Sequence, residues 1–235
     1  MKVILNEKLI ASRGRLGKIA SFVGLGVLLL GFILSFFPRF FIISLICLLV
    51  GLIISNIGTY NLNRWVKRPR SDEAIARALK GLDDRFWLFS YVFPAEHVIL
   101  APSGLYVVKP KPHDGEIICE GNRWHRKFKW TRLLRAFYEE GLGNPTMEVI
   151  AEADKMRSFL SSRLPEDFEV EIKEVILFTN PAARLELKSP AIPVLTPKAL
   201  KNFIRRKGEK SDFSGEQYKT LLGIFTDYAK EVGVL

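Results

Sequence analysis

The stretch from Glu96 to Gly115, EHVILAPSGLYVVKPKPHDG, decides the fold, because it predicts two short β-strands joined by a Pro-Ser-Gly turn. Apolar and β-branched residues fill both runs, and turn-forming residues separate them. We expect the strands at about 97–101 and 105–109.

The second strand ends at Lys109-Pro110-Lys111. Side chains two residues apart on a strand point to the same face, so both ammonium groups face one way. The carboxylate of Glu96 precedes the first strand and is expected nearby. Pro110 lacks a backbone donor and suggests that the strand ends or bulges there.

The rest of residues 71–235 predicts a mixed α/β domain, a sheet flanked by helices. Its helices begin at capping residues: Ser71, Asn144, Thr196 and Ser214. The expected elements in chain order are a helix at 71–84, strands at 86–93, 97–101, 105–109 and 116–120, a helix at 144–164, strands at 175–179 and 194–195, and helices at 196–206 and from 214 onward.

Two apolar runs at 19–37 and 40–58 precede this domain, interrupted by Pro38-Arg39. A helix of about 19 residues crosses a hydrocarbon core of roughly 30 Å. A cleaved signal peptide fits less well, because the first run is long and a second follows at once. A buried hairpin in a soluble protein is the other alternative. We expect a transmembrane hairpin.

Basic residues flank this hairpin, and they predict its orientation. Residues 1–70 contain ten Lys/Arg and one acid, whereas residues 71–235 contain 25 and 24, so +9 of the net charge of +10 belongs to the segment with the membrane flanks. The positive-inside rule places both chain ends in the cytoplasm, at the plasma (inner) membrane. Anionic lipid therefore explains the basicity better than nucleic acid does. The expected organisation is a basic N-terminus at 1–18, the hairpin at 19–58, a juxtamembrane linker at 59–70 and the domain at 71–235.

Several function classes have no motif here. The sequence contains no G-x-G-x-x-G, Walker or G-x-S-x-G motif, and its three histidines lack metal-ligand spacing. Its two cysteines, Cys47 and Cys119, lie far apart and fit a reducing compartment.

The hairpin sequence resembles the core of the nuclease-related domain (NERD) family, a branch of the restriction-endonuclease-like superfamily. The shared core is H-V-[IV]-x-x-P-S-G-[LV]-[YF]-V-V. Further similarities are Asn144-Pro145, VILFTNP from Val175 to Pro181, and VLTPKALKNFI, so the resemblance spans about 71–206.

The resemblance implies a catalytic set of an Asp before the His and a Glu-x-Lys at the end of the next strand. The family's carboxylates hold a divalent cation and its lysine acts on the attacking water or the phosphorane. Here Glu96 stands at the Asp position, Lys109 at the Glu position and Lys111 at the Lys position. A helical polar position after Asn-Pro corresponds to Glu148.

Lys109 reverses the charge of a metal ligand. The family pattern sums to −1, and Glu96, Lys109 and Lys111 sum to +1. At about 4 Å and an effective dielectric near 20, each unit-charge pair is worth roughly 4 kcal/mol, so Mg²⁺ should bind weakly. We expect no cofactor, no bound metal, and a Lys109–Glu96 pair instead.

Two alternatives remain open at this site. Both lysines could lie on an exposed strand end without a specific role. An active metal-dependent nuclease could instead recruit Asp114, Glu116 or Glu148 as the lost Mg²⁺ ligand, and three acids within about 5 Å of one point would favour it.

A basic, aromatic stretch at 122–135, NRWHRKFKWTRLLR, is a candidate binding segment. Interleaved basic and aromatic residues suit anionic lipid headgroups, and they suit single-stranded nucleic acid. Ordinary core aromatics on a solvated element are the third interpretation. The candidate binding residues are Arg123, Trp124, Arg126, Lys127, Lys129 and Trp130.

The sequence therefore predicts a membrane-anchored nuclease-related domain that is catalytically inactive and acts as a binding or scaffold module. A membrane-tethered, metal-dependent nuclease with a rearranged site is the alternative. The expected partners are the lipid bilayer and its anionic headgroups. Nucleic acid has weaker support, and the sequence names no protein partner.

Overall fold

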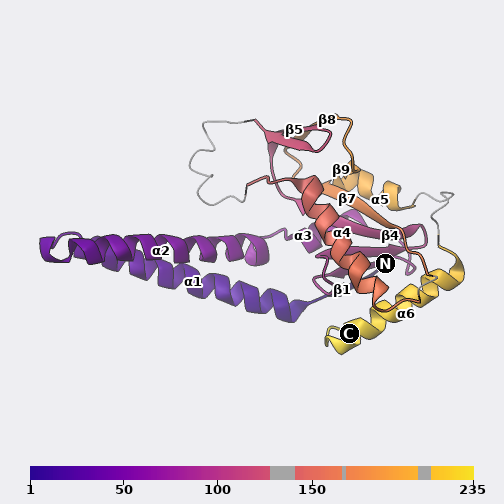
Figure 1. The fold of residues 1–235 in the computed structure, drawn as a ribbon, viewed down its shortest axis with the longest axis horizontal. Helices are drawn as coiled ribbons and strands as arrows, with labels where there is room; N and C mark the ends of the chain where they lie inside the picture. The colour runs from indigo at the N-terminus through magenta and orange to yellow at the C-terminus, as the bar shows by residue number, and fades with distance from the viewer. Residues whose placement is uncertain (128–140, 166–167, 206–212) are drawn as a thin grey trace. The chain divides into compact units, whose positions relative to one another are not determined.

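The computed structural model describes residues 1–127, 141–165, 168–205 and 213–235 (Figure 1). The chain forms two compact units. One contains Met1–Asn6 together with the described residues of 71–127 and 142–235, and the other contains Glu7–Arg70. The mixed α/β domain predicted from the sequence is confirmed in the first unit.

The second unit is a helical hairpin. Helix α1 spans Glu7–Leu34 and helix α2 spans Phe41–Asn61. A 3₁₀ turn, η1 (Pro38–Phe40), joins them, and a π-helical turn, η2 (Leu62–Val66), extends α2. Both helices are longer than predicted, and each is long and apolar enough to cross a membrane.

Small residues at every seventh position line the contact between α1 and α2. In α1 they are Gly17, Gly24 and Gly31, and in α2 they are Ser44, Gly51 and Gly58, all buried. A Cβ atom at Gly58 would lie 2.5 Å from the backbone nitrogen of Ser21. The seven-residue period keeps one face of each helix on its partner. The outer surface of the hairpin is covered with exposed Phe, Leu and Ile side chains.

The first unit is built on a six-stranded mixed sheet of order β1-β2-β3-β4-β7-β9. Strands β2, β3 and β4 are antiparallel neighbours, whereas β1, β7 and β9 are added in parallel. The strands are β1 (Lys2–Leu5), β2 (Trp87–Ser90), β3 (His97–Ala101), β4 (Gly104–Lys111), β7 (Ile172–Phe178) and β9 (Val194–Leu195).

Strand β1 corrects the predicted N-terminal segment of 1–18. Residues 2–5 pair in parallel with β2, and the amino group of Met1 donates a hydrogen bond to the carbonyl oxygen of Leu82 at 2.7 Å. A four-residue strand gives too short a pattern to recognise in the sequence. The α/β unit therefore includes residues that come before and after the helical hairpin in the sequence.

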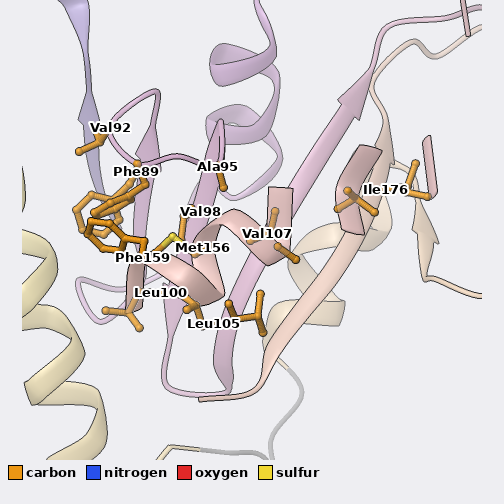
Figure 2. Packing of buried hydrophobic residues seen from close by; sticks show 14 of the residues in the cluster. Phe89, Val92, Ala95, Val98, Leu100, Leu105, Val107, Met156, Phe159 and Ile176 are labelled. Carbon is orange, nitrogen blue, oxygen red and sulfur yellow. The ribbon is translucent and has the colours of Figure 1, made fainter. Parts of the chain in front are cut away.

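Four helices cover the two faces of the six-stranded sheet. Helices α4 (Pro145–Ser161) and α6 (Gly215–Glu231) pack on one face, and α3 (Ser71–Ala78) and α5 (Pro197–Arg205) pack on the other. In Figure 2, Met156 and Phe159 of α4 lie among Val98, Leu100 and Val107 of the sheet. The predicted caps at Asn144 and Ser214 are confirmed, the latter as a full capping box.

A second, three-stranded sheet has the order β6-β5-β8. Strand β5 (Gly115–Glu120) was expected, but β6 (Arg123–Arg126) and β8 (Ala183–Lys188) were not. The inward residues Ile117, Cys119 and Trp124 belong to the core that α4 and α6 also cover.

The Pro-Ser-Gly turn has a structural role. The buried Ser103 hydroxyl donates a hydrogen bond to the carbonyl oxygen of Ile204, in the last turn of α5, at 2.5 Å. The Tyr106 hydroxyl donates to Ser103 Oγ at 3.1 Å. Gly104 has φ = +132°, a conformation that favours glycine. The turn thus ties the β3–β4 hairpin to the C-terminal end of α5.

The expectation that β4 ends or bulges at Pro110 is wrong. The strand continues to Lys111, and Pro110 pairs in register with Leu177 of β7. Pairing with β3 ends at Val107, so Pro110 has a neighbouring strand on one side only. Proline is tolerated at such an edge-like position.

Candidate functional site

Lys109 and Lys111 lie on the face of β4 that packs under α4. Leu105 and Val107, on the same face, belong to the core under α4 and α6, whereas Tyr106 and Val108 belong to the core under α3 and α5. This alternation places both lysines beneath the N-terminal half of α4, with side-chain exposures of 13% and 5%. The interpretation of two lysines on an exposed strand end is therefore wrong.

Three carboxylates surround the ammonium group of Lys109. Its Nζ atom lies 2.6 Å from Glu152 Oε1, 3.6 Å from Glu148 Oε2 and 3.7 Å from Glu96 Oε1. The backbone N–H of Glu96 also donates to Glu152 Oε2 at 3.2 Å. Glu152 therefore joins α4 to both Lys109 and the segment before β3. The predicted Lys109–Glu96 pair exists, but Glu152 is the closer partner.

Lys111 forms a second ion pair beside the first. Its Nζ atom contacts both oxygens of Glu148, at 2.7 and 2.8 Å, and donates to the carbonyl oxygen of Leu142 at 2.9 Å. Gly143, with φ = +63°, closes the turn above this pair, and a Cβ atom there would lie 2.6 Å from Glu148 Oε1. The positive φ and this close approach both favour glycine where the chain passes over the carboxylate.

We name these five residues the Lys109 centre: Glu96, Lys109, Lys111, Glu148 and Glu152. Three carboxylates and two ammonium groups give it a net charge of −1, so the sum of +1 from the sequence is wrong for the assembled site. The two carboxylates that bring the sum to −1, Glu148 and Glu152, come from α4. Two of the carboxylates are partly exposed, Glu96 at 28% and Glu148 at 33%.

The charges of the centre shift two pKa values. Burial alone would lower the pKa of Lys109, but the charges of Glu152, Glu96 and Glu148 and the Glu152 hydrogen bond outweigh it and raise that pKa above 10.5. Burial, with the neighbouring charge of Glu96, raises the pKa of Glu152 despite its pairing with Lys109. Lys109 is therefore firmly protonated.

The Lys109 centre does not fit a divalent cation as it is arranged. Three carboxylates converge on one point, as a metal site requires, but the Lys109 ammonium stands at that point. In the described part of the chain, no group of three or more His, Cys, Asp or Glu side chains could hold a metal ion. A cation would meet a fixed positive charge at hydrogen-bond distance from the ligands.

Two of the alternative metal ligands lie in other ion pairs. Asp114 pairs with Arg126, and Glu116 pairs with Lys127 at 2.7 Å. Both pairs stabilise the start of the three-stranded sheet, where β5 and the end of β6 meet. Of the three alternative metal ligands named from the sequence, Asp114, Glu116 and Glu148, it is Glu148 that belongs to the Lys109 centre.

Sequence reasoning missed Glu152. It lies one turn after Glu148 and next to Ala153, on the buried face that also carries Val149 and Met156. Its side chain is 8% exposed. A carboxylate on the apolar face of an amphipathic helix is the signal that would have identified it, because a buried acid requires a partner.

The candidate binding segment is described only up to Lys127, so Lys129 and Trp130 lie outside the described residues. Trp124 is buried, and its indole N–H donates to Thr146 Oγ1 at 2.8 Å. For Trp124, the core-aromatic interpretation is therefore correct. Arg126 and Lys127 form the ion pairs described above, and Arg123 is exposed on β6.

The fold and the centre together define a mixed-sheet α/β domain with charged residues gathered at a strand end beneath a helix. Residues 69–179 match the family model of the nuclease-related domain, NERD. A nuclease-related domain is thus present over these residues, which contain the whole Lys109 centre. The match ends before the last part of the resemblance expected at 71–206. No curated protein and no solved structure matches the chain.

Proposed function

We propose that this protein is a membrane-anchored, catalytically inactive nuclease-related domain that acts as a binding or scaffold module at the cytoplasmic membrane face. One observation carries the proposal: the ammonium group of Lys109 stands among the three carboxylates of the centre, 2.6 Å from Glu152. The carboxylates are satisfied by lysines instead of by a metal ion. A degenerate motif of this kind preserves the fold while it removes the cation that phosphodiester hydrolysis uses.

The anchoring part of the proposal rests on the hairpin of α1 and α2. Both helices are long and apolar enough to span a bilayer, and their outer surfaces are apolar. Basic residues before α1 and after α2 favour the cytoplasm for both chain ends, at the plasma (inner) membrane. Anionic lipid headgroups are the proposed partners of these flanks.

A second candidate function is a metal-dependent nuclease with a rearranged site. The convergence of three carboxylates within 3.7 Å of one point favours it. This function requires Lys109 to leave that point before a cation such as Mg²⁺ could bind. The buried, short Lys109–Glu152 pair opposes such a movement.

A nicking assay separates the two candidates. Full-length protein in detergent is incubated with supercoiled DNA and Mg²⁺ or Mn²⁺, beside Glu96→Ala and Lys111→Ala variants. We expect no metal-dependent cleavage above the level of the two variants. Metal-dependent cleavage by the wild type that both substitutions abolish would establish the nuclease instead.

Membrane anchoring is tested separately. Membranes that contain the full-length protein are washed with alkaline carbonate, which removes peripheral proteins, and then with detergent. We expect the protein to stay in the membrane pellet until detergent is added. Release by carbonate would show that the hairpin does not span the bilayer.

A further inference from the structure

The two helical layers that cover the sheet carry opposite charge. Helices α3 and α5 contain four basic and two acidic residues, a net charge of +2. Helices α4 and α6 contain four basic and six acidic residues, a net charge of −2. The six-stranded sheet therefore separates a positive layer from a negative one.

The charge of the positive layer is displayed outward. Helix α5 has no acidic residue, buries Leu200 and Ile204, and exposes Lys198 and Arg205. Helix α3 contributes the exposed Arg77, and the turn after it contributes the exposed Lys80. Lys201 Nζ donates to the carbonyl oxygen of Lys80 at 2.7 Å. This bond and the shared core hold the two helices as one surface.

Acids beside this layer are covered or paired. Asp72, in the first turn of α3, is buried, and Glu73 is half-buried. After α3, Asp83 pairs with Arg85 at 2.6 Å, and Asp84 pairs with the Met1 amino group at 3.1 Å. The net charge of the surface formed by α3 and α5 therefore remains positive.

The connection to the hairpin is short. Helix α2 ends at Asn61 and α3 begins at Ser71, so nine residues join them. Such a segment spans at most about 35 Å even when fully extended. Five of these residues form the turn η2, which shortens the reach further. In an anchored protein, α3 begins within a short distance of the headgroups.

We infer that the surface formed by α3 and α5 docks on anionic lipid headgroups and orients the domain on the membrane. This inference rests on the proposed membrane anchoring. Positive residues held near an anionic surface gain energy that falls off within a Debye length. The Lys109 centre lies on the opposite face of the sheet, under α4, so docking turns it toward the cytosol. The negative α4–α6 layer disfavours the reverse orientation.

The test uses full-length protein in lipid nanodiscs, with a fluorophore on a single cysteine in a Cys47→Ala/Cys119→Ala background. One label replaces the exposed Asn202 on α5, and a second, separate label replaces the exposed Ser158 on α4. A headgroup-attached nitroxide quenches nearby fluorophores. Discs contain phosphatidylcholine alone or equal parts of phosphatidylcholine and phosphatidylglycerol.

We expect quenching at position 202 only with phosphatidylglycerol, and none at position 158 in either disc. Each basic residue near an anionic surface favours docking by about fivefold, so Lys198→Gln/Lys201→Gln/Arg205→Gln should lower the docked population by roughly a hundredfold. The matched control, Lys155→Gln/Lys219→Gln/Lys230→Gln, removes three charges from the opposite layer and should leave quenching unchanged. High salt should abolish the quenching without any substitution.

Equal quenching at 202 and 158, or quenching that is independent of phosphatidylglycerol, would overturn the inference. A salt-sensitive anisotropy shift of single-stranded DNA that the α5 substitutions abolish, without lipid-dependent quenching, would assign the surface to nucleic acid instead. If the protein resists carbonate extraction but shows no quenching at position 202, the docking surface is wrong and the anchoring stands. If carbonate releases the protein from the membrane, the anchoring itself is wrong.

Discussion

Lys109 Nζ on β4 lies 2.6 Å from Glu152 Oε1 on α4, and the two side chains are 13% and 8% exposed. Helix α4 therefore does more than cover the sheet, because it supplies the closest counter-charge for Lys109. Glu148, one turn earlier on the same helix, does the same for Lys111. The two ion pairs connect Lys109 and Lys111 of β4 to α4.

Replacing Lys109 by methionine should destabilise the domain. The substitution keeps much of the side-chain volume but leaves Glu152 buried beside Glu96 with no neighbouring ammonium. Removal of one partner from a buried pair costs about 3–5 kcal/mol. We expect a loss of this size in the free energy of unfolding, measured by urea titration of the full-length protein in detergent.

The double variant Lys109→Met/Glu152→Gln provides the control for this prediction. Because it removes both charges of the pair, it should recover a substantial part of the loss, with a coupling energy of about 1–3 kcal/mol. If the two single substitutions prove additive, the pair does not hold β4 to α4.

The stabilisation by Lys109 should disappear at alkaline pH. Its pKa in the folded protein is raised above the ordinary value of 10.5, so its contribution is fully present below 10.5 and is lost as the pH rises through the higher, folded value. We expect the difference in unfolding free energy between wild type and Lys109→Met to stay constant near neutral pH. It should shrink only above about 10.5, when urea titrations are repeated along a pH series.

Loss of that difference near neutral pH would show that Lys109 is deprotonated there. It would mean that burial, which acts to lower the pKa of Lys109, outweighs the three carboxylates.

Much of the fold could be predicted from local pattern. Helix α4 was placed by its Asn144-Pro145 start and apolar spacing, and the β3–β4 hairpin by its Pro-Ser-Gly turn. The strands β1, β6 and β8 were missed, because each is only four to six residues long and none has a continuous run of buried residues. Strands β1 and β8 pair with segments far away in the sequence, which a single sequence does not display, whereas β6 pairs with its neighbour β5 across a two-residue turn.

The site was predictable only in part, for a related reason. Glu96, Lys109 and Lys111 lie close together in the sequence, and their strand positions indicated a common location. Glu152 lies on α4, 43 residues after Lys109 in the sequence, and its distance from Lys109 depends on how α4 crosses the sheet. The charge of the centre changed sign because that packing adds acids from a distant segment.

The Pro-Ser-Gly turn should contribute to stability and not to the Lys109 centre. Ser103→Ala removes a buried hydroxyl that donates to Ile204 and accepts from Tyr106. We expect a loss of about 1–3 kcal/mol, because the carbonyl oxygen of Ile204 loses a donor and the Tyr106 hydroxyl keeps only the backbone carbonyl oxygen of residue 103, at 3.3 Å. The exposed Ser158→Ala on α4, whose hydroxyl also donates to a backbone carbonyl, should cost much less. Equal losses in urea titrations of the two variants would contradict this role.

Lys109→Glu should create a divalent-cation site. The substitution removes the ammonium at the centre and adds a fourth carboxylate beside Glu96, Glu148 and Glu152. At about 4 Å, each unit-charge pair contributes roughly 4 kcal/mol at an effective dielectric of 20, and a divalent ion doubles this. Even with strong screening, we expect the affinity for Mn²⁺ to rise at least about a hundredfold over the wild type, measured by calorimetry. Lys219→Glu on α6 makes the same charge change away from the centre and should have no such effect. Wild-type protein that binds Mn²⁺ as tightly as the Lys109→Glu variant would show that Lys109 does not exclude the cation, and the inactive assignment would fail with it.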